Sequence, residues 1–439
     1  MKVALMTLGC KVNYYESEKV MKAFAARGCD IVEFTESADI YLINTCTVTN
    51  IADRKSRQMI HRAAKMAPDA VIVAVGCYVE SAGESVRNDP DIDIAFSNRD
   101  KSDLAEKVLD FWMERNKSRS ESMTGGAVKS GTDMHKKRTR AFIKVQDGCN
   151  QFCSYCLIPF VRGRGELNST PADEVVREIS ERVENGCSEV VLTGIHLSSY
   201  GVTGKSADGF VKEGGAKLVD LIRQVQGISG LRRIRLGSLE PRIITEEWVG
   251  AVSDCDKLCP HFHLSLQSGC DAVLSRMNRH YTTSDYKKSV NILRKYYDEP
   301  AVTTDVIVGF PGETDEEFRR TVDFLDDIGF ADLHIFQYSM RNGTRAAAMS
   351  DQVSPSEKKK RSEELIGMMD TWHARFRERS MKIPSEILFE EYIKEGDDEL
   401  LAGYDERYQR FGVNRAIAEE RGWRPGMVAG VDRNLFLNL

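Results

Sequence analysis

Three cysteines lie close together in the segment GCNQFCSYCLIPFVRGR, residues 148–164. Their spacing is C-x3-C-x2-C, for Cys149, Cys153 and Cys156, which is tight enough for one metal centre. Tetrahedral zinc sites and common four-iron sites take four protein ligands. The spacing therefore predicts either a fourth ligand from elsewhere in the chain or a cluster in which one iron stays open.

A zinc site is one interpretation of these three cysteines. The segment CDKLCPHFH, residues 255–263, could supply the fourth ligand from a cysteine or a histidine. However, zinc sites of cysteine and histidine normally show paired spacings. His263 also alternates with Phe262 and Leu264 as in a strand, and a strand histidine that faces a pocket is the simpler explanation.

Three further cysteines each follow an apolar run that predicts a buried parallel strand. The runs and their cysteines are Val3–Leu8 with Cys10, Ile40–Ile43 with Cys46, and Val71–Val75 with Cys77. The ligand crevice of an open α/β sheet lies outside the carboxyl ends of its strands. Cysteine is also common as a small buried hydrophobe, but three at equivalent strand ends indicate a second site. The other cysteines are predicted to be structural thiols: Cys29, Cys187, Cys255, Cys259 and Cys270.

The alternation of apolar runs and amphipathic stretches predicts an α/β fold class with four parts. Residues 1–115 are predicted to form an open parallel-sheet domain, with helices at Glu16–Arg27 and Ile51–Ala67, and residues 116–137 a polar linker. Residues 138–380 predict a six-unit partial (β/α) barrel, short of the eight units that close a full one. Residues 381–439 carry short strands that fit a small β-barrel.

The predicted barrel strands place the first cysteine segment. They are Phe142–Gln146, Glu189–Thr193, Arg233–Leu236, Phe262–Leu266, Val302–Val308 and Asp332–Gln337. Cys149 follows the first of these strands, so its loop is expected at the carboxyl-terminal face, where barrels build their active sites.

Composition limits the class of protein. Of the 439 residues, 29% are charged and 41% hydrophobic, and the net charge of −6 excludes a chain coated in positive charge but not local basic patches. The first apolar run ends at Leu8, too short for a signal peptide, and no run is long enough to cross a bilayer. We therefore expect a cytoplasmic, metal-binding protein without a membrane partner, because cysteines in a reducing compartment are more often ligands than disulfides.

With Tyr155 beside Cys156 and two cysteine triads in this order, the chain resembles the radical S-adenosylmethionine methylthiotransferases. Further segments resemble this family: GIHLSSYG (194–201), RIRLGSLEP (233–241), HLSLQSG (263–269), TDVIVGFPGET (304–314) and FQYSMRNGT (336–344). The resemblance implies an N-terminal domain with an auxiliary cluster, a radical S-adenosylmethionine barrel and a C-terminal TRAM domain.

The resemblance also implies the cofactors: two 4Fe–4S clusters, one on each triad, and S-adenosyl-L-methionine. S-adenosylmethionine would bind the open iron beside Cys149, Cys153 and Cys156 and yield a 5′-deoxyadenosyl radical. A sulfur held at the auxiliary cluster, methylated by a second S-adenosylmethionine, would be inserted at the substrate carbon. No side chain is assigned as acid or base, because no base could deprotonate an unactivated C–H bond. The implied cofactor-binding residues are Tyr155, Thr193, Gly194, Ser238, Glu240 and Gln267.

The segments GCKVNYYES and INTCTVTN resemble the branch of the family that modifies C2 of N6-threonylcarbamoyladenosine at position 37 of tRNA. The implied partners are tRNA and an electron donor such as flavodoxin or ferredoxin. Alternatives are isopentenyladenosine in tRNA, an aspartate of a ribosomal protein, and a zinc-containing RNA-binding protein without catalysis. Predicted RNA-binding residues are Arg162, Arg164, Arg341, Tyr404 and Tyr408.

Positive charge is needed opposite RNA phosphates. The helix predicted after Cys46 carries such charges: Arg54, Lys55, Arg57, Arg62 and Lys65. Residues 383–439, by contrast, hold seven basic and twelve acidic residues, a net charge of −5. This tail is therefore expected to be a poor general phosphate binder.

Overall fold

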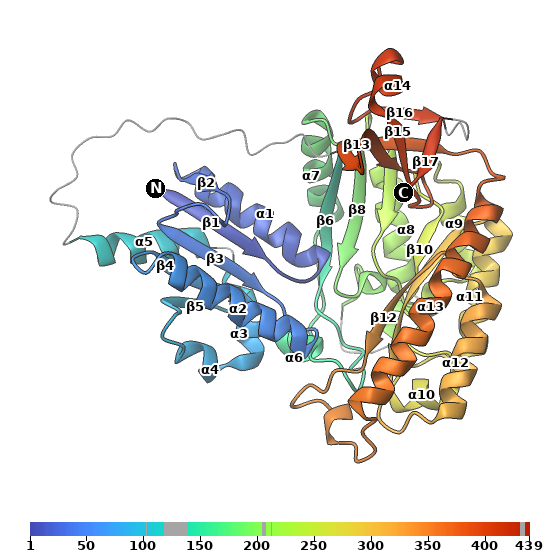
Figure 1. Ribbon diagram of the computed structural model, residues 1–439, viewed down its shortest axis with the longest axis horizontal. Helices are drawn as coiled ribbons and strands as arrows, with labels where there is room; N and C mark the ends of the chain where they lie inside the picture. The colour runs from blue at the N-terminus through green and yellow to red at the C-terminus, as the bar shows by residue number, and fades with distance from the viewer. Residues whose placement is uncertain (102, 118–138, 204–207, 212, 431–434) are drawn as a thin grey trace. The chain divides into compact units, whose positions relative to one another are not determined.

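The computed structural model describes residues 1–101, 103–117, 139–203, 208–211, 213–430 and 435–439 (Figure 1). The chain divides into two compact units. The N-terminal unit consists of residues 1–136, 156–165 and 339–344, and the barrel unit of residues 137–155, 166–338 and 345–439. The predicted linker, residues 116–137, lies almost wholly outside the described residues.

The N-terminal unit contains a parallel sheet whose described strands run in the order β2-β1-β3-β4-β5. The strands are β1 (Lys2–Thr7), β2 (Asp30–Val32), β3 (Ile40–Thr45), β4 (Val71–Gly76) and β5 (Ile94–Phe96). The helices are α1 (Lys11–Ala25), α2 (Asn50–Met66), α3 (Cys77–Ala82), α4 (Glu84–Arg87), α5 (Leu104–Asn116) and, from residues 156–165, α6 (Ile158–Val161). The three predicted strands are confirmed, and β2 and β5 flank them.

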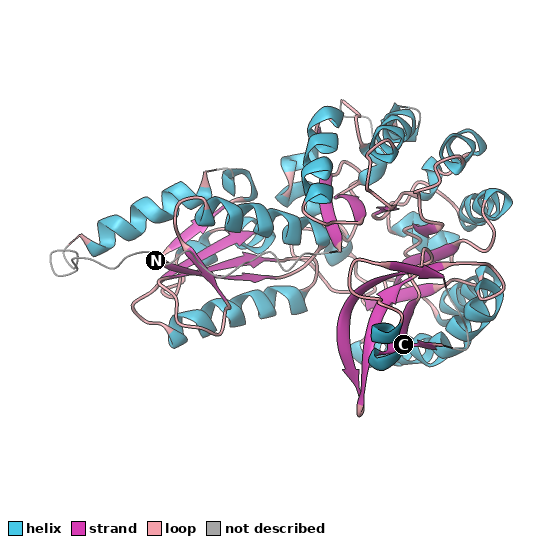
Figure 2. Cartoon of the chain, turned by 90° about the horizontal axis from the view of Figure 1, so that it is seen from above, coloured by secondary structure: helices cyan, strands magenta, loops and turns pink. Residues whose placement is uncertain are grey.

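Helices cover both faces of this sheet (Figure 2). Every residue of β3 and β4 is buried, so alternate side chains pack into two separate apolar cores. Ile60 and Ala63 of α2 pack in one core, and Phe24 of α1 and Val108 of α5 pack in the other. The near-continuous apolar runs in the sequence are thus explained by burial on two sides.

The barrel unit contains the six predicted parallel strands, in chain order. They are β6 (Arg140–Asp147), β8 (Glu189–Gly194), β9 (Arg233–Leu236), β10 (His261–His263), β11 (Ala301–Val308) and β12 (Asp332–Gln337), with β7 (Asn168–Ser169) antiparallel to β6. Single bridges join β9 to β10 at Ile234–Leu258 and Leu239–Leu264. The structure confirms a partial barrel of six units.

Helices surround the barrel strands. They are α7 (Ala172–Glu184), α8 (Glu213–Gln226), α9 (Glu246–Ser253), α10 (Asp271–Arg276), α11 (Thr283–Tyr296), α12 (Asp315–Ile328) and α13 (Pro355–Ser380). The sequence marks several of their ends. For α12, Thr314 and Glu317 form a capping box, and Gly329 ends the helix at a φ of 66°.

The chain ends in an antiparallel sheet in the order β16-β13-β14-β15-β17. Its elements are β13 (Glu386–Glu395), β14 (Asp398–Tyr404), β15 (Arg410–Asn414), α14 (Arg415–Glu420), β16 (Val428–Gly430) and β17 (Phe436–Asn438). The sheet curls around a small apolar core that includes Ile387, Phe389 and Phe411. Within the described residues it is a half-barrel, since β16 and β17 are its two edges.

A buried carboxylate at the amino-terminal end of the barrel strands connects this sheet to the barrel. Glu189, at the start of β8, accepts hydrogen bonds from Arg140 and from Arg235 Nε, the latter at 2.8 Å. Arg235 also donates to the carbonyl oxygens of Asp405 at 2.5 Å and Glu406 at 2.8 Å. Burial alone would raise the pKa of Glu189, but the adjacent arginines outweigh it and hold the pKa below its ordinary value.

We expect Glu189→Gln to destabilise the barrel unit by about 3–5 kcal/mol, because it leaves buried guanidinium groups without their shared carboxylate. The matched control is Glu391→Gln, which removes an exposed ion pair with Arg410 and should cost only about 0–1 kcal/mol. Urea unfolding followed by tryptophan fluorescence measures both. Equal midpoints for the two variants would contradict a structural role for Glu189.

Candidate metal centres

The loop after β6 carries Cys149 and Cys153 and is fixed by backbone hydrogen bonds. Ser154 donates from its backbone nitrogen to the carbonyl oxygen of Met277 at 2.9 Å and from its hydroxyl to that of Arg276 at 2.8 Å. Its own carbonyl oxygen accepts from the backbone nitrogen of Ala346 at 2.7 Å. The end of α10 and the segment before α13 therefore hold the cysteine loop in one conformation.

Tyr155 anchors the same loop through its ring. The ring meets Phe310 edge-on, with centroids 6.4 Å apart, and packs on an apolar cluster that includes Met277 and Tyr338. The following residue, Cys156, begins the segment 156–165 that belongs to the N-terminal unit. The predicted cofactor-binding role of Tyr155 stays a prediction, and the structure shows a packing role.

The thiols of this loop have the properties of metal ligands. Burial, together with the neighbouring Cys153, raises the pKa of Cys149 to about 12. A bound metal reverses this effect, because it deprotonates a coordinating thiol. Arg279 Nη1 lies 3.2 Å from the Sγ atom of Cys153 and donates to it.

A buried carboxylate lies behind this arginine. Glu240 accepts from Arg279 Nη2 at Oε2 and from Arg242 Nε at Oε1, both at 3.0 Å, and only 4% of Glu240 is exposed. Two carboxylate oxygens offer about four acceptor positions, so Glu240 retains capacity for another donor. Sequence reasoning singled out Glu240 but missed Arg279, because no spacing links Arg279 to the cysteine segment.

The other residues implied for cofactor binding lie at the carboxyl ends of β8, β9 and β10. Thr193 and Gly194 end β8, Ser238 is exposed just past β9, and Gln267 is buried with a φ of 75°. At Gly194 an added Cβ would lie 2.9 Å from Oε1 of Gln146, so the glycine leaves room for that side chain. These positions fit the edge at which barrels bind ligands, and their binding roles stay predictions.

The second triad follows three neighbouring strands, β1, β3 and β4. Cys46 and Cys77 directly follow Thr45 and Gly76, which are register partners, so both cysteines leave the sheet side by side. Cys10, at the start of α1, follows Gly9, where an added Cβ would lie 2.7 Å from Sγ of Cys46. The structure therefore brings the loops of all three cysteines to one edge of the sheet.

The electrostatics of these thiols support their proximity. Burial raises the pKa of Cys46 to about 11, and Cys77 and Cys10 add to this increase. Cys10 is exposed, whereas Cys46 and Cys77 are buried. All eleven cysteines lie in the described residues, and none of them forms a disulfide. A group that takes thiolate ligands thus fits the second triad, as it fits Cys149 and Cys153.

Two predicted RNA-binding arginines are buried in the N-terminal unit. Arg341 is 5% exposed and donates to Thr47 Oγ1 at 2.6 Å and Asp53 Oδ2 at 2.7 Å. Arg162 is 2% exposed and pairs with Glu16. Neither guanidinium could contact RNA without leaving these partners, so their RNA role has no support from the geometry. Arg164, in contrast, is exposed and has a φ of 52°.

The two tyrosines predicted to bind RNA lie at the base of the barrel. Tyr404 and Tyr408 stack with ring centroids 4.9 Å apart, and the guanidinium of Arg140 lies over both rings. Arg140 Nη1 also donates to the hydroxyl of Tyr408 at 2.9 Å. Both rings are partly buried, and their RNA role stays a prediction.

The residues considered as a fourth zinc ligand each have a different environment in the structure. Cys255 packs in the barrel core, and Cys259 is buried beside Arg235. His263 Nδ1 is hydrogen-bonded to Thr303 Oγ1 at 2.9 Å, and His263 Nε2 lies 3.3 Å from Asp305 Oδ2. In the described part of the chain, the groups that could hold a single ion contain no cysteine.

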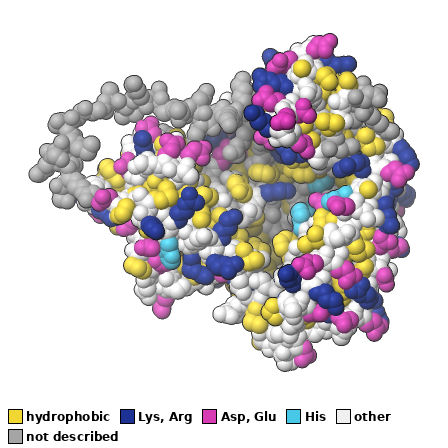
Figure 3. Space-filling model, in the orientation of Figure 1, with side chains coloured by type: hydrophobic (Ala, Val, Ile, Leu, Met, Phe, Trp, Pro, Cys, Tyr) yellow, Lys and Arg dark blue, Asp and Glu magenta, His cyan; other side chains and the backbone are white. Residues whose placement is uncertain are grey.

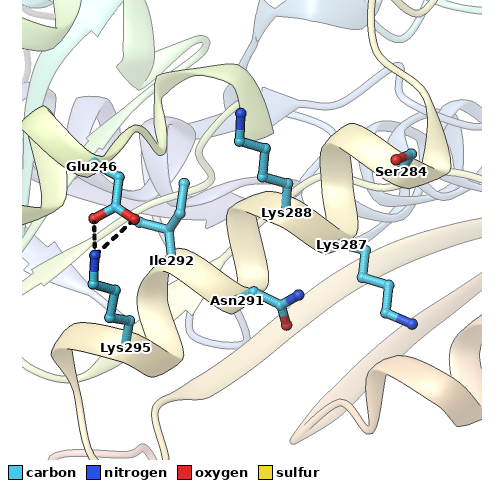
Figure 4. Close-up of a pocket in the computed structure, with 7 residues that line it drawn as sticks. All are labelled: Glu246, Ser284, Lys287, Lys288, Asn291, Ile292 and Lys295. Atoms are coloured by element: carbon cyan, nitrogen blue, oxygen red, sulfur yellow. Dashed lines mark hydrogen bonds and ion pairs between the residues drawn. The ribbon is translucent and has the colours of Figure 1, made fainter.

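A surface depression of about 450 Å³ lies on the outer side of α11 (Figure 4). Lys287, Lys288 and Lys295 line it, and Lys295 pairs with Glu246 at 2.9 Å. No cysteine lines it, and its side chains are those of a solvated helix face. We assign no function to it.

Comparisons with known proteins identify the family. Residues 143–325 match the radical SAM superfamily, and residues 2–97 match the uncharacterized protein family UPF0004. The chain is 39% identical over 416 residues to threonylcarbamoyladenosine tRNA methylthiotransferase MtaB of Bacillus subtilis, covering 93% of this chain and 89% of the relative. It is 33% identical to tRNA-2-methylthio-N(6)-dimethylallyladenosine synthase of Syntrophus aciditrophicus, covering 84% and 79%.

A solved structure with a similar fold is the radical S-adenosylmethionine methyltransferase TsrM from Kitasatospora setae. The TM-score is 0.55 at 15% identity, and the match covers 76% of this chain and 72% of that chain. Among the described residues, no helix is both long and apolar enough to cross a membrane. The family implies S-adenosylmethionine and a 4Fe–4S cluster, which the cysteine loop after β6 fits. From its domains and its relatives, the chain belongs to the radical S-adenosylmethionine tRNA methylthiotransferases.

Proposed function

We propose that the protein methylthiolates C2 of N6-threonylcarbamoyladenosine at position 37 of tRNA. The reaction uses two S-adenosylmethionine molecules, one as methyl donor and one as radical source, and two 4Fe–4S clusters. Cys149, Cys153 and Cys156 hold the first cluster, and the N-terminal triad holds the second. The observation that carries the proposal is this second triad, whose loops meet at one edge of the sheet.

The protein's part in this chemistry is to hold and orient reactive groups. When bound, the cluster and S-adenosylmethionine supply a radical that can remove a hydrogen atom from an unactivated C–H bond. The cysteines bind iron as thiolates, and Arg279 donates a hydrogen bond to the Sγ atom of Cys153. Glu240 fixes Arg279 and presents its remaining acceptor positions to the ligand.

The relatives and two short segments support the proposed nucleoside. Relatives named as threonylcarbamoyladenosine enzymes are 33–39% identical to this chain, and relatives named as dimethylallyladenosine enzymes are 32–34% identical. The segments GCKVNYYES and INTCTVTN, which carry Cys10 and Cys46, favour the first group. A flavodoxin or ferredoxin is the proposed electron donor, and the cytoplasm, where tRNA is found, is the proposed compartment.

The exposed side of α2 is the proposed RNA-binding surface of the N-terminal unit. Figure 3 shows lysine and arginine side chains gathered on this unit. The one acidic residue of α2, Asp53, is paired with Arg341. Five cations of α2 are exposed: Arg54, Lys55, Arg57, Arg62 and Lys65. In the C-terminal sheet, by contrast, Arg410 and Arg415 pair with carboxylates. Phosphate contacts are therefore expected on α2 rather than on this sheet.

We expect the double variant Lys55→Gln/Arg62→Gln to weaken tRNA binding about tenfold near 0.1 M salt. It should also reduce the slope of log K against log salt by about 2, one unit for each lost phosphate contact. The matched control is Lys107→Gln/Arg115→Gln on α5, which removes the same charge and should change neither value. Filter binding across a salt series measures both variants. Equal slopes for the two would contradict the α2 surface.

Nucleoside mass spectrometry of tRNA from a strain lacking the protein tests the proposed substrate. Loss of only the methylthio-threonylcarbamoyl nucleoside, restored by the intact gene but not by a Cys153→Ala gene, is the expected result. Loss of the methylthio-isopentenyl nucleoside, or of a methylthio-aspartate peptide, would assign one of the other branches. Bound zinc without sulfide in the purified protein would favour the RNA-binding protein without catalysis.

A further inference from the structure

Arg162 is a buried, charged side chain in contact with the second triad. Its Nε atom donates to Sγ of Cys77 at 3.4 Å. Its Nη1 and Nη2 atoms donate to the two carboxylate oxygens of Glu16, each at 3.0 Å. The bidentate pair with Glu16 thus fixes the plane of the guanidinium, and its Nε–H group points to the sulfur.

The same guanidinium also reaches the loops of the other two cysteines. Arg162 Nη2 donates to Oδ1 of Asn13 at 2.8 Å, and Asn13 is 1% exposed. Asn13 Nδ2 donates to the carbonyl oxygens of Leu8 at 2.7 Å and Thr45 at 3.0 Å. These carbonyls lie on the segments that lead into Cys10 and Cys46, so one arginine is connected to all three cysteine loops.

A second basic side chain lies beside this arginine. Glu16 also pairs with Lys101 at 2.5 Å, so two cations share one carboxylate beside Cys77. The neutral side-chain amide of Asn98 also donates to Cys77 Sγ, at 3.5 Å. Burial lowers the pKa of Lys101, so the cation in contact with the sulfur is Arg162, and a cation there favours an anionic group at Cys77.

We propose that Arg162 is a positioning residue for the auxiliary cluster. Arg162 orders the three ligand loops and, through its hydrogen bond to Cys77, raises the reduction potential of the cluster. The proposal rests on the proposed function, which places a cluster on this triad. The potentials of iron–sulfur clusters depend on net charge, hydrogen bonds to the sulfurs and exposure to solvent. Removing a cationic donor from a ligand sulfur therefore makes the cluster harder to reduce.

The test uses the full chain with Cys149, Cys153 and Cys156 all replaced by alanine, so that only the auxiliary triad can hold iron. Iron and sulfide analysis after anaerobic reconstitution gives the cluster content. A redox titration followed by electron paramagnetic resonance gives the reduction potential. In this background we expect Arg162→Leu to shift the potential to a more negative value and Arg162→Lys to shift it less.

Glu16→Gln provides a test of sign. It removes a negative charge but leaves Arg162 and Cys77 in place, so the potential should shift to a less negative value. Arg115→Leu is the control, because it removes the same charge from the same unit at an ion pair with Asp93. It should leave the potential unchanged. A merely structural role for Arg162 would not give opposite shifts for Arg162→Leu and Glu16→Gln.

The outcomes separate this proposal from the one on which it rests. If the parent binds a cluster and neither Arg162→Leu nor Glu16→Gln changes its reduction potential, the proposed role of Arg162 is overturned. The proposed second cluster would not be affected by that result. If Arg162→Leu does not fold, the Arg162→Lys and Glu16→Gln potentials decide. A parent that binds no iron on the second triad would overturn both proposals.

Discussion

The variant Cys153→Ala is expected to abolish reductive cleavage of S-adenosylmethionine. The fall should be roughly a thousandfold or more, equal to about 4 kcal/mol of activation free energy. Alanine removes one thiolate ligand and the acceptor of the Arg279 hydrogen bond, 3.2 Å away. Chromatographic measurement of 5′-deoxyadenosine after reduction with dithionite gives the rate.

Cys187→Ala is the matched control for this variant. Cys187 is a buried thiol of the barrel core, and its Sγ lies 3.1 Å from the backbone carbonyl oxygen of Glu189. Its replacement should leave 5′-deoxyadenosine formation intact, and iron analysis should show one cluster fewer only in Cys153→Ala. Undiminished cleavage in Cys153→Ala would exclude this triad as the radical centre.

The meeting of the three N-terminal cysteine loops could be predicted from the sequence because the topology of parallel sheets fixes where strand ends meet. Apolar runs identified β1, β3 and β4, and parallel pairing of neighbours then placed Cys10, Cys46 and Cys77 at one edge. No such rule connects an arginine to a sulfur more than 80 residues away. Arg162 and Cys77 meet because residues 156–165 fold with the N-terminal unit, which the sequence pattern does not encode locally.

The surroundings of the charged residues could not be predicted from the sequence. Arg162 and Arg341 were predicted to face RNA, yet both are buried with carboxylate partners. A basic residue in a loop has the same local pattern whether its partner is a phosphate or a distant glutamate. The short edge strand β2 escaped prediction for a related reason, since three residues give too little periodicity to recognise.

The last prediction separates radical formation from sulfur transfer. Cys46→Ala should leave 5′-deoxyadenosine formation near the level of the parent protein, because Cys149 and Cys153 lie on a different loop in the barrel unit. The same variant should lose methylthiolated tRNA product by roughly a thousandfold or more, equal to about 4 kcal/mol. Liquid chromatography with mass spectrometry measures both products in one reaction.

Cys29→Ala is the matched control for Cys46→Ala, because Cys29 is also a buried thiol of the N-terminal unit but lies in the core just before β2, at the amino end of that strand. It should keep both activities and the full iron content, whereas Cys46→Ala should lose about half of the iron. A Cys46→Ala protein that forms methylthiolated product at the parent rate would make the second triad structural. Loss of both activities together would instead mean that radical formation depends on the second triad, since removal of Cys46 leaves the ligands of the first one untouched.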